Sequence, residues 1–186
     1  VEGLMPSPSR RIRHLALTSA RRDALRQGER LVTEAFRTAS LAEATAGRVL
    51  VVRSLDLGRL STRQSPSAVA LTLEKKMRAL SSNLVHWSDS SAPQREAVLF
   101  RDESEPLRAL ASKLARGQSA HGWYWRAAVP GFWPSMPRAE AFRLILRRVE
   151  ETRAGLAAVA ELVDHLVRIN SVAPLLEALE PQRILD

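Results

Sequence analysis

Residues 47–58, with the sequence GRVLVVRSLDLG, constrain the fold of this chain most strongly. They begin with a Val/Leu run that is apolar at successive positions and is bounded by glycines, a pattern typical of a buried β-strand. Residues 10–19 mix polar and apolar positions at a period of two, and residues 95–102 (REAVLFRD) carry another short apolar run. Both are therefore predicted strands. A helix predicted between the first two strands indicates a βαβ crossover or half of a ferredoxin-like unit.

Helices are predicted between and after these strands, because apolar residues recur there at helical spacing. One helix covers residues 21–40. A second follows an N-cap at Ser65, with Pro66 at its first helical position. A third begins at a cap on Ser104 and stops at Gly117. The fold class predicted is α+β, with a small βαβ-type sheet module of about three strands and packed helices.

Four regions are expected along the chain. Residues 1–9 are rich in proline and serine and read as a flexible arm. An α+β module then occupies residues 10–120, and an aromatic and proline-rich connector follows over residues 121–137. Residues 138–186 form a C-terminal helical region, predicted as a helical hairpin or one long helix that is kinked or broken near Gly155.

The connector holds five of the nine aromatic residues, within HGWYWRAAVPGFWP at positions 121–134. Large aromatic side chains can fill a seam between packed parts, stack on the bases of single-stranded nucleic acid, or anchor a protein partner. The seam is the interpretation we favour, with some rings turned inward and others toward a partner. The candidate partner-binding residues are Trp123, Tyr124, Trp125, Arg126, Phe132 and Trp133.

Positive charge is concentrated in the first third of the chain. The formal net charge is +8, and residues 1–63 contribute +6 of it from 12 basic and 6 acidic side chains. Such a region can attract nucleic acid, anionic lipid or an acidic protein surface, but a solvated arginine-rich face is the simpler interpretation. The candidate basic patch comprises Arg10, Arg11, Arg13, Arg21 and Arg22.

Signatures of catalysis are weak. The chain has no cysteine, and it lacks the glycine-rich loops that cradle phosphates or expose a nucleophile. The residue types of a hydrolase triad are present as His86, Ser88 and Asp89. All three lie in one polar loop, HWSDSSAPQ, whereas a triad needs a base that is oriented from elsewhere in the fold. The four histidines have no metal-ligand spacing, and His165 is interpreted as a helix-surface residue. We expect no enzymatic activity, no metal site and no cofactor.

One motif resembles a known family. The stretch RVLVVRSLDLGRL, with Leu55, Asp56, Leu57 and Gly58 at the strand end, is similar to a strand near the start of tape-measure-type proteins from extracellular, phage-tail-like contractile injection systems. The preceding strand and helix, the later WYWRAAVPGFWP segment and the leucine-rich LLEALEP helix follow the same order. The resemblance implies a structural or assembly protein, in a tape-measure-like, cap or adaptor role, that binds other subunits as a homo- or hetero-oligomer.

The length of the chain limits this role. Even 186 fully helical residues would span at most ~280 Å, so an assembly, capping or adaptor component, or a fragment of a longer tape, fits better than a complete ruler. Asp56 and Gly58 would then be structural: the carboxylate accepts backbone N–H groups and the glycine takes a positive φ. We expect a bacterial cytoplasmic protein and leave its incorporation into a particle open. The alternative is a nucleic-acid-binding module that uses the basic third and the tryptophan-rich segment.

Overall fold

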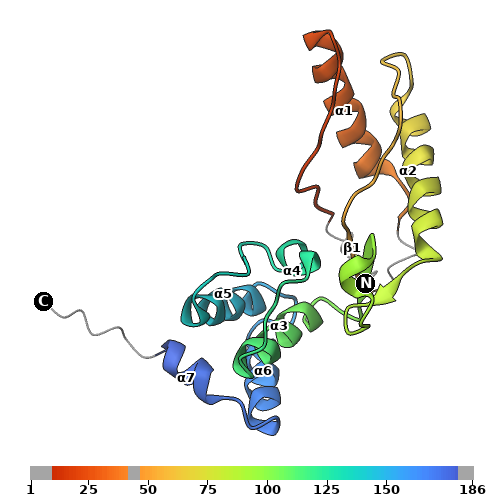
Figure 1. The fold of residues 1–186 in the computed structure, drawn as a ribbon. Coiled ribbons are helices and arrows are strands. Elements are labelled where there is room, and N and C mark those ends of the chain that lie inside the picture. Colours follow the sequence, from red (N-terminus) through yellow and green to blue (C-terminus); the bar gives the residue numbers. More distant parts are fainter. Residues whose placement is uncertain (1–9, 42–46, 180–186) are drawn as a thin grey trace, which may run out of the picture. The chain divides into compact units, whose positions relative to one another are not determined.

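The computed structural model describes residues 10–41 and 47–179, so the arm predicted at residues 1–9 lies outside the described part. These ranges contain seven α-helices and a three-stranded mixed sheet, which confirms the α+β class (Figure 1). The chain divides into two compact units. The helical unit comprises residues 1–46 and 54–84, and the mixed unit comprises residues 47–53 and 85–186. The predicted boundaries at residues 120 and 137 both fall inside the mixed unit.

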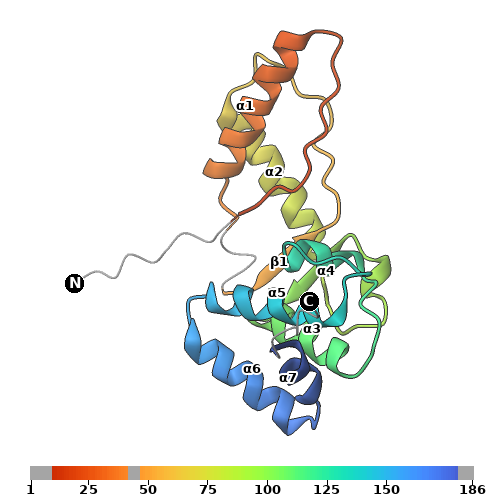
Figure 2. The ribbon, with the colours of Figure 1, turned by 90° about the vertical axis from the view of Figure 1, so that its left-hand side faces the viewer.

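The helical unit is built on α1 (Arg22–Thr38) and α2 (Pro66–Ser81). The two helices lie side by side and run in the same direction, as Figures 1 and 2 show. Small side chains dominate the core between them, so little apolar surface is available to stabilise the pair. The buried members of this core are Ala35, Ala39, Val69, Ala70 and Leu73.

Helix α2 begins as its sequence predicts. The hydroxyl oxygen of Ser65 accepts the backbone N–H of Ala68 at 3.2 Å, and Pro66 occupies the first turn. Proline is favourable there because its missing N–H would have no partner inside the helix. The predicted cap is confirmed.

The strand predicted at residues 10–19 is wrong, because this segment is irregular and almost entirely exposed. A period of two identifies a strand only where a neighbouring strand supplies hydrogen bonds and one face is buried. The strand predicted over residues 47–58 is shorter than expected, ending at Val52. Leu55 and Leu57 instead pack on the core of the helical unit.

The turn predicted at the end of that motif is confirmed. Asp56 Oδ1 accepts the N–H of Gly58 at 2.8 Å, and Gly58 has a φ of 73°. A short carboxylate side chain that bonds its own backbone two residues later is a common way of fixing a turn.

The sheet of the mixed unit has the strand order β1-β3-β2. β1 (Val49–Val52) pairs antiparallel with β3 (Ala97–Phe100), and β2 (Val85–His86) pairs parallel with β3. The predicted third strand is thereby confirmed. The βαβ crossover predicted between residues 10–19 and 47–58 is wrong, because residues 10–19 form no strand. β2 and β3 are joined by turns and the 3-10 turn η2 (Ala92–Gln94). His86, predicted in a loop, ends β2.

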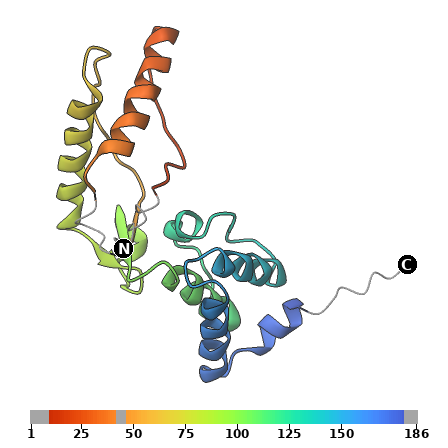
Figure 3. The ribbon, with the colours of Figure 1, turned by 180° about the vertical axis from the view of Figure 1, so that it is seen from behind.

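Five helices complete the mixed unit: α3 (Glu105–Ala115), α4 (Trp123–Ala128), α5 (Arg138–Glu150), α6 (Leu156–Arg168) and α7 (Ala173–Leu179). The C-terminal helical region is broken near Gly155 into α5 and α6, one of the outcomes predicted. The chain turns between α5 and α6 at Gly155, which has a φ of 51° (Figure 2). α3, α5 and α6 pack against one another (Figure 3). Their core includes Phe100, Leu110, Trp125, Phe142, Ile145, Leu162 and Leu166.

Helix α3 begins differently from the prediction. Ser104 stands at the N-cap position, but its side chain makes no capping hydrogen bond. Asp102 Oδ1 instead accepts the N–H groups of Ser104 and Glu105, at 2.8 and 2.7 Å. A carboxylate at this position also interacts favourably with the helix dipole. The predicted stop is confirmed, because Gly117 follows the last turn with a φ of 66°.

Across residues 10–41 and 47–179, no helix is both long enough and apolar enough to cross a lipid bilayer.

Candidate functional site

The aromatic segment is mostly core. Tyr124, Trp125 and Phe132 are 4%, 1% and 3% exposed, so these three predicted partner-binding side chains are not available to a partner in this structure. Trp123 is half-buried. Trp133 is 41% exposed and Arg126 is exposed, and a partner role for these two stays a prediction. The segment is also not a plain loop, because its first half forms α4.

Aromatic rings from β3, α4 and the turn after β2 form one cluster in the core of the mixed unit. The Trp87 ring stacks on Phe100 with ring centres 6.3 Å apart and planes inclined by 12°. Trp125 meets the edge of Trp87 at 5.3 Å, and Tyr124 packs 5.1 Å from Trp125. Offset and edge-on contacts of this kind stabilise aromatic pairs beyond the area they bury. Within this cluster Tyr124 is buried, whereas Trp87 is half-buried and reaches the surface.

The predicted basic patch lies in the helical unit. Arg10 is engaged there, because its guanidinium donates to the backbone carbonyl of Phe36 at 2.9 Å near the end of α1. The other four arginines of the patch, Arg11, Arg13, Arg21 and Arg22, are exposed. Arg22 is followed on α1 by the exposed Arg26 and Arg30 at intervals of four residues, so the three guanidinium groups share one helix face.

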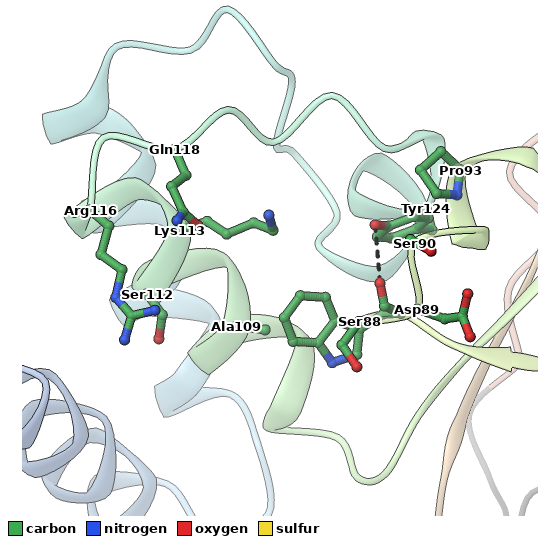
Figure 4. Close-up of a pocket in the computed structure, with 11 residues that line it drawn as sticks. Ser88, Asp89, Ser90, Pro93, Ala109, Ser112, Lys113, Arg116, Gln118 and Tyr124 are labelled. Atoms are coloured by element: carbon green, nitrogen blue, oxygen red, sulfur yellow. Dashed lines mark hydrogen bonds between the residues drawn. The ribbon is translucent and has the colours of Figure 1, made fainter.

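A surface pocket of about 420 Å³ opens in the mixed unit (Figure 4). Three segments build it: the turn after β2, the last two turns of α3, and α4. Their residues differ in chemistry, and the pocket combines an apolar wall with hydroxyl and cationic groups. The lining includes Trp87, Ser88, Pro93, Ala109, Ser112, Lys113, Arg116, Gln118 and Tyr124.

The apolar wall is fixed by Tyr124. Its hydroxyl donates a hydrogen bond to the backbone carbonyl of Trp87 at 3.3 Å, and burial raises the pKa of this phenol. Gly122 leaves the space that the ring requires, because a Cβ there would lie 2.6 Å from Tyr124 Cζ. The position of this wall therefore depends on a glycine outside the pocket.

The cationic side belongs to α3. Lys113 lies in the last turn of α3 and Arg116 is the C-cap residue, so both cations stand at the C-terminal end of this helix. Figure 4 shows Lys113 extending across the pocket and Arg116 lying beside Ser112. Neither side chain forms an ion pair with a carboxylate in the described parts of the chain.

Asp89 is the one carboxylate that lines the pocket, and it is engaged elsewhere. Its Oδ1 accepts both the N–H and the hydroxyl of Ser91, at 2.8 and 2.7 Å. These two bonds, aided by the charge of Arg95, hold the pKa of Asp89 below its usual value. Figure 4 shows this carboxylate directed away from Lys113 and Arg116. The pocket therefore has a net positive character.

Behind the pocket, His165 of α6 meets Ser112 of α3, with Nε2 and Oγ 2.9 Å apart. His165, interpreted from the sequence as a helix-surface residue, lies on α6 and is half-buried, with its ring against α3. Burial lowers the pKa of His165, and the positive charges of Arg168, Arg108 and Arg116 lower it further. Arg108 and Arg168 have carboxylate partners, namely Asp102 and Glu161 for Arg108 and Asp164 for Arg168.

His86 joins Ser88 to Glu105. The imidazole Nδ1 lies 2.7 Å from Ser88 Oγ, and Nε2 lies 3.0 and 3.2 Å from the Glu105 carboxylate oxygens. A hydrolytic triad has the same order of hydroxyl, imidazole and carboxylate. The carboxylate here belongs to Glu105, whereas the sequence offered Asp89 as the candidate. Asp89 is not part of this arrangement.

Local geometry also accounts for these contacts. Ser88 is two residues from His86 in the same turn, and its own N–H approaches Nδ1 at 3.4 Å. Glu105 also accepts the backbone N–H of Arg101. Burial alone would raise the pKa of Glu105, but this N–H and the contact with His86 outweigh burial and lower it. The three side chains thus tie the end of β2 to the start of α3.

Only some of the residues that line this pocket could be identified as candidates from the sequence. Tyr124, Ser88 and Asp89 were singled out for other reasons, whereas Trp87, Lys113 and Arg116 were missed. One signal for the cations was present, since they lie three residues apart in the last turns of a predicted helix. No group of three or more histidine, aspartate or glutamate side chains in the described ranges could hold a metal ion.

Comparison of the chain with protein-family models, curated proteins and solved structures gives no match.

Proposed function

We propose that this chain is a non-enzymatic assembly protein that binds other subunits of a phage-tail-like contractile injection particle, in a tape-measure-like, cap or adaptor role. The feature of the molecule that supports binding is the pocket of the mixed unit. It combines a rigid aromatic wall with two cations that lack a carboxylate partner among the described residues. Such a surface suits recognition, because aromatic and positively charged groups are common anchors of protein interfaces.

The assignment to an injection particle depends on the motif at Leu55–Gly58 and on the order of segments around it. In this protein Leu55 and Leu57 pack on the helical unit, and Asp56 with Gly58 forms a turn. These contacts support a structural role for the motif.

Mass spectrometry of purified particles and of their assembly intermediates tests this function. The chain should be recovered at a fixed ratio to tube, sheath or baseplate subunits in at least one of these fractions. Its absence from both the particles and the intermediates would rule the proposal out.

A nucleic-acid-binding function is the second candidate, and the spacing of Arg22, Arg26 and Arg30 on one face of α1 favours it. Phosphate contacts make such binding depend steeply on salt concentration. Fluorescence anisotropy with labelled single- and double-stranded oligonucleotides at low salt would detect it. If neither oligonucleotide binds, this candidate is eliminated.

A further inference from the structure

The mixed unit presents two positive charges that its own described residues do not neutralise. Lys113 and Arg116 stand at the C-terminal end of α3, and Asp89, the nearest acidic side chain of the pocket lining, is held by Ser91 and directed away from them. Three other arginines of this unit are ion-paired, whereas the exposed Arg147, for example, has no carboxylate partner among the described residues. Arg108, Arg148 and Arg168 all have carboxylate partners within 3.0 Å.

An apolar surface lies directly beside these cations. Trp87, Pro93, Ala109 and Tyr124 line the other side of the pocket, and the aromatic cluster behind them prevents the two rings from moving apart. A volume of about 420 Å³ lies near the lower end of the range for ligand pockets. It has room for one or two side chains of a partner.

From this arrangement we infer that the pocket binds an acidic peptide segment, in which a carboxylate stands next to an aromatic or large apolar side chain. Lys113 and Arg116 pair with the carboxylate, and the half-buried Trp87 and the exposed Pro93 contact the apolar side chain. Tyr124 is buried and supports Trp87 from behind. This inference rests on the proposed function, because it supplies the chemical class of the partner segment. The carboxylate can belong to an acidic side chain or to the end of a chain.

Binding is measured by NMR titration of the full chain with three short peptides. The first has a glutamate side chain next to phenylalanine and an amidated end, the second ends in phenylalanine with a free carboxylate, and the third ends in phenylalanine amide. The signals followed are the indole N–H of Trp87 and the side-chain amide of Gln118, because both residues line the pocket. At least one carboxylate peptide should shift these signals to saturation, and the neutral peptide should bind about tenfold more weakly or not at all.

The decisive variant is Lys113→Gln combined with Arg116→Gln. Its matched control is Lys75→Gln combined with Arg78→Gln, which removes one lysine and one arginine, also three residues apart and exposed, from α2. The pocket variant should lose about tenfold or more in affinity, whereas the control should stay within about twofold. Thermal unfolding of each variant checks that the fold is intact. We expect it to be, because all four side chains lie outside the buried cores.

Three results would overturn the inference: no peptide shifts the two signals, the neutral peptide binds as well as the acidic ones, or both double variants lose affinity equally. Particle preparations separate this failure from failure of the proposed function. If the wild-type chain and the pocket variant are recovered with particles in equal amounts, the pocket is not the docking site, while the assembly role stands. If peptides bind as expected but the wild-type chain never accompanies particles, the assembly role fails and the pocket chemistry stands.

Discussion

Glu105 ties the start of α3 to the end of β2. Its carboxylate accepts the Arg101 N–H and pairs with His86, so Glu105→Gln should lower the free energy of unfolding at pH 7 by about 1–3 kcal/mol. The folded-state pKa lies below its ordinary value of 4.5. This contribution is therefore present above pH 4.5 and is lost as the pH falls through the folded-state pKa.

Urea denaturation of the wild type and the variant between pH 7 and pH 3 measures this effect. The difference between the two proteins should shrink in acid. Glu103→Gln, at an exposed neighbouring position, should change stability by less than about 0.5 kcal/mol. A difference that is equally large at pH 3 would mean that ionised Glu105 does not stabilise the fold.

Ser88 is expected to be chemically unreactive. A nucleophilic serine needs a base and also donors that stabilise the developing oxyanion, and the bond from Ser88 to His86 is a contact within one turn. A fluorophosphonate probe should therefore modify Ser88 no faster than Ser90, as measured by peptide mass spectrometry. Selective modification of Ser88 that disappears in His86→Ala would instead identify an enzyme.

At the scale of elements, glycine decides where the C-terminal helices separate. Gly155 has a φ of 51° and a ψ of −125°, a conformation that other residues adopt only with strain. Gly155→Ala should destabilise the protein by about 1–3 kcal/mol. Gly28, inside α1, has ordinary helical geometry, and a Cβ there would lie 3.5 Å from Leu17 Cδ1, an ordinary contact.

Gly28→Ala is the matched control, and it should stabilise α1 by about 0.5–1 kcal/mol. Circular dichroism during thermal unfolding measures both variants. The account of the α5–α6 break fails if Gly155→Ala leaves the melting temperature unchanged or raises it.

Elements that depend on nearby residues could be predicted from the sequence. Ser65 and Pro66 define the start of α2 through contacts within four residues, and the same holds for the turn at Asp56 and Gly58. The segment at residues 10–19 could not be judged in this way, because a strand exists only if a distant partner pairs with it. The pocket was missed for the same reason, since Trp87, Lys113 and Tyr124 converge from three separate segments.

At the scale of the whole molecule, the cores of the two units differ in the size of the side chains that they bury. The helical unit is held by a cluster rich in alanine, whereas the mixed unit buries Trp125, Phe100 and Phe142 almost completely. Because stability follows the apolar surface removed from water, the two units should open at different free energies.

Native-state hydrogen exchange measures this difference. Backbone amides of α1 and α2 should exchange through openings of lower free energy than those of β3 and α3. Equal protection in both sets would show that the chain unfolds as one cooperative unit.

The central claim is that this chain acts by binding a partner subunit at the pocket of its mixed unit. A photo-crosslinking residue placed at Gln118, on the exposed rim of the pocket, tests it in cells that make the particle, with the same residue at Lys76 of α2 as the control. The account predicts a covalent adduct with a particle subunit from position 118 and none from position 76. Adducts that are absent at position 118, or that are the same at both positions, would contradict it.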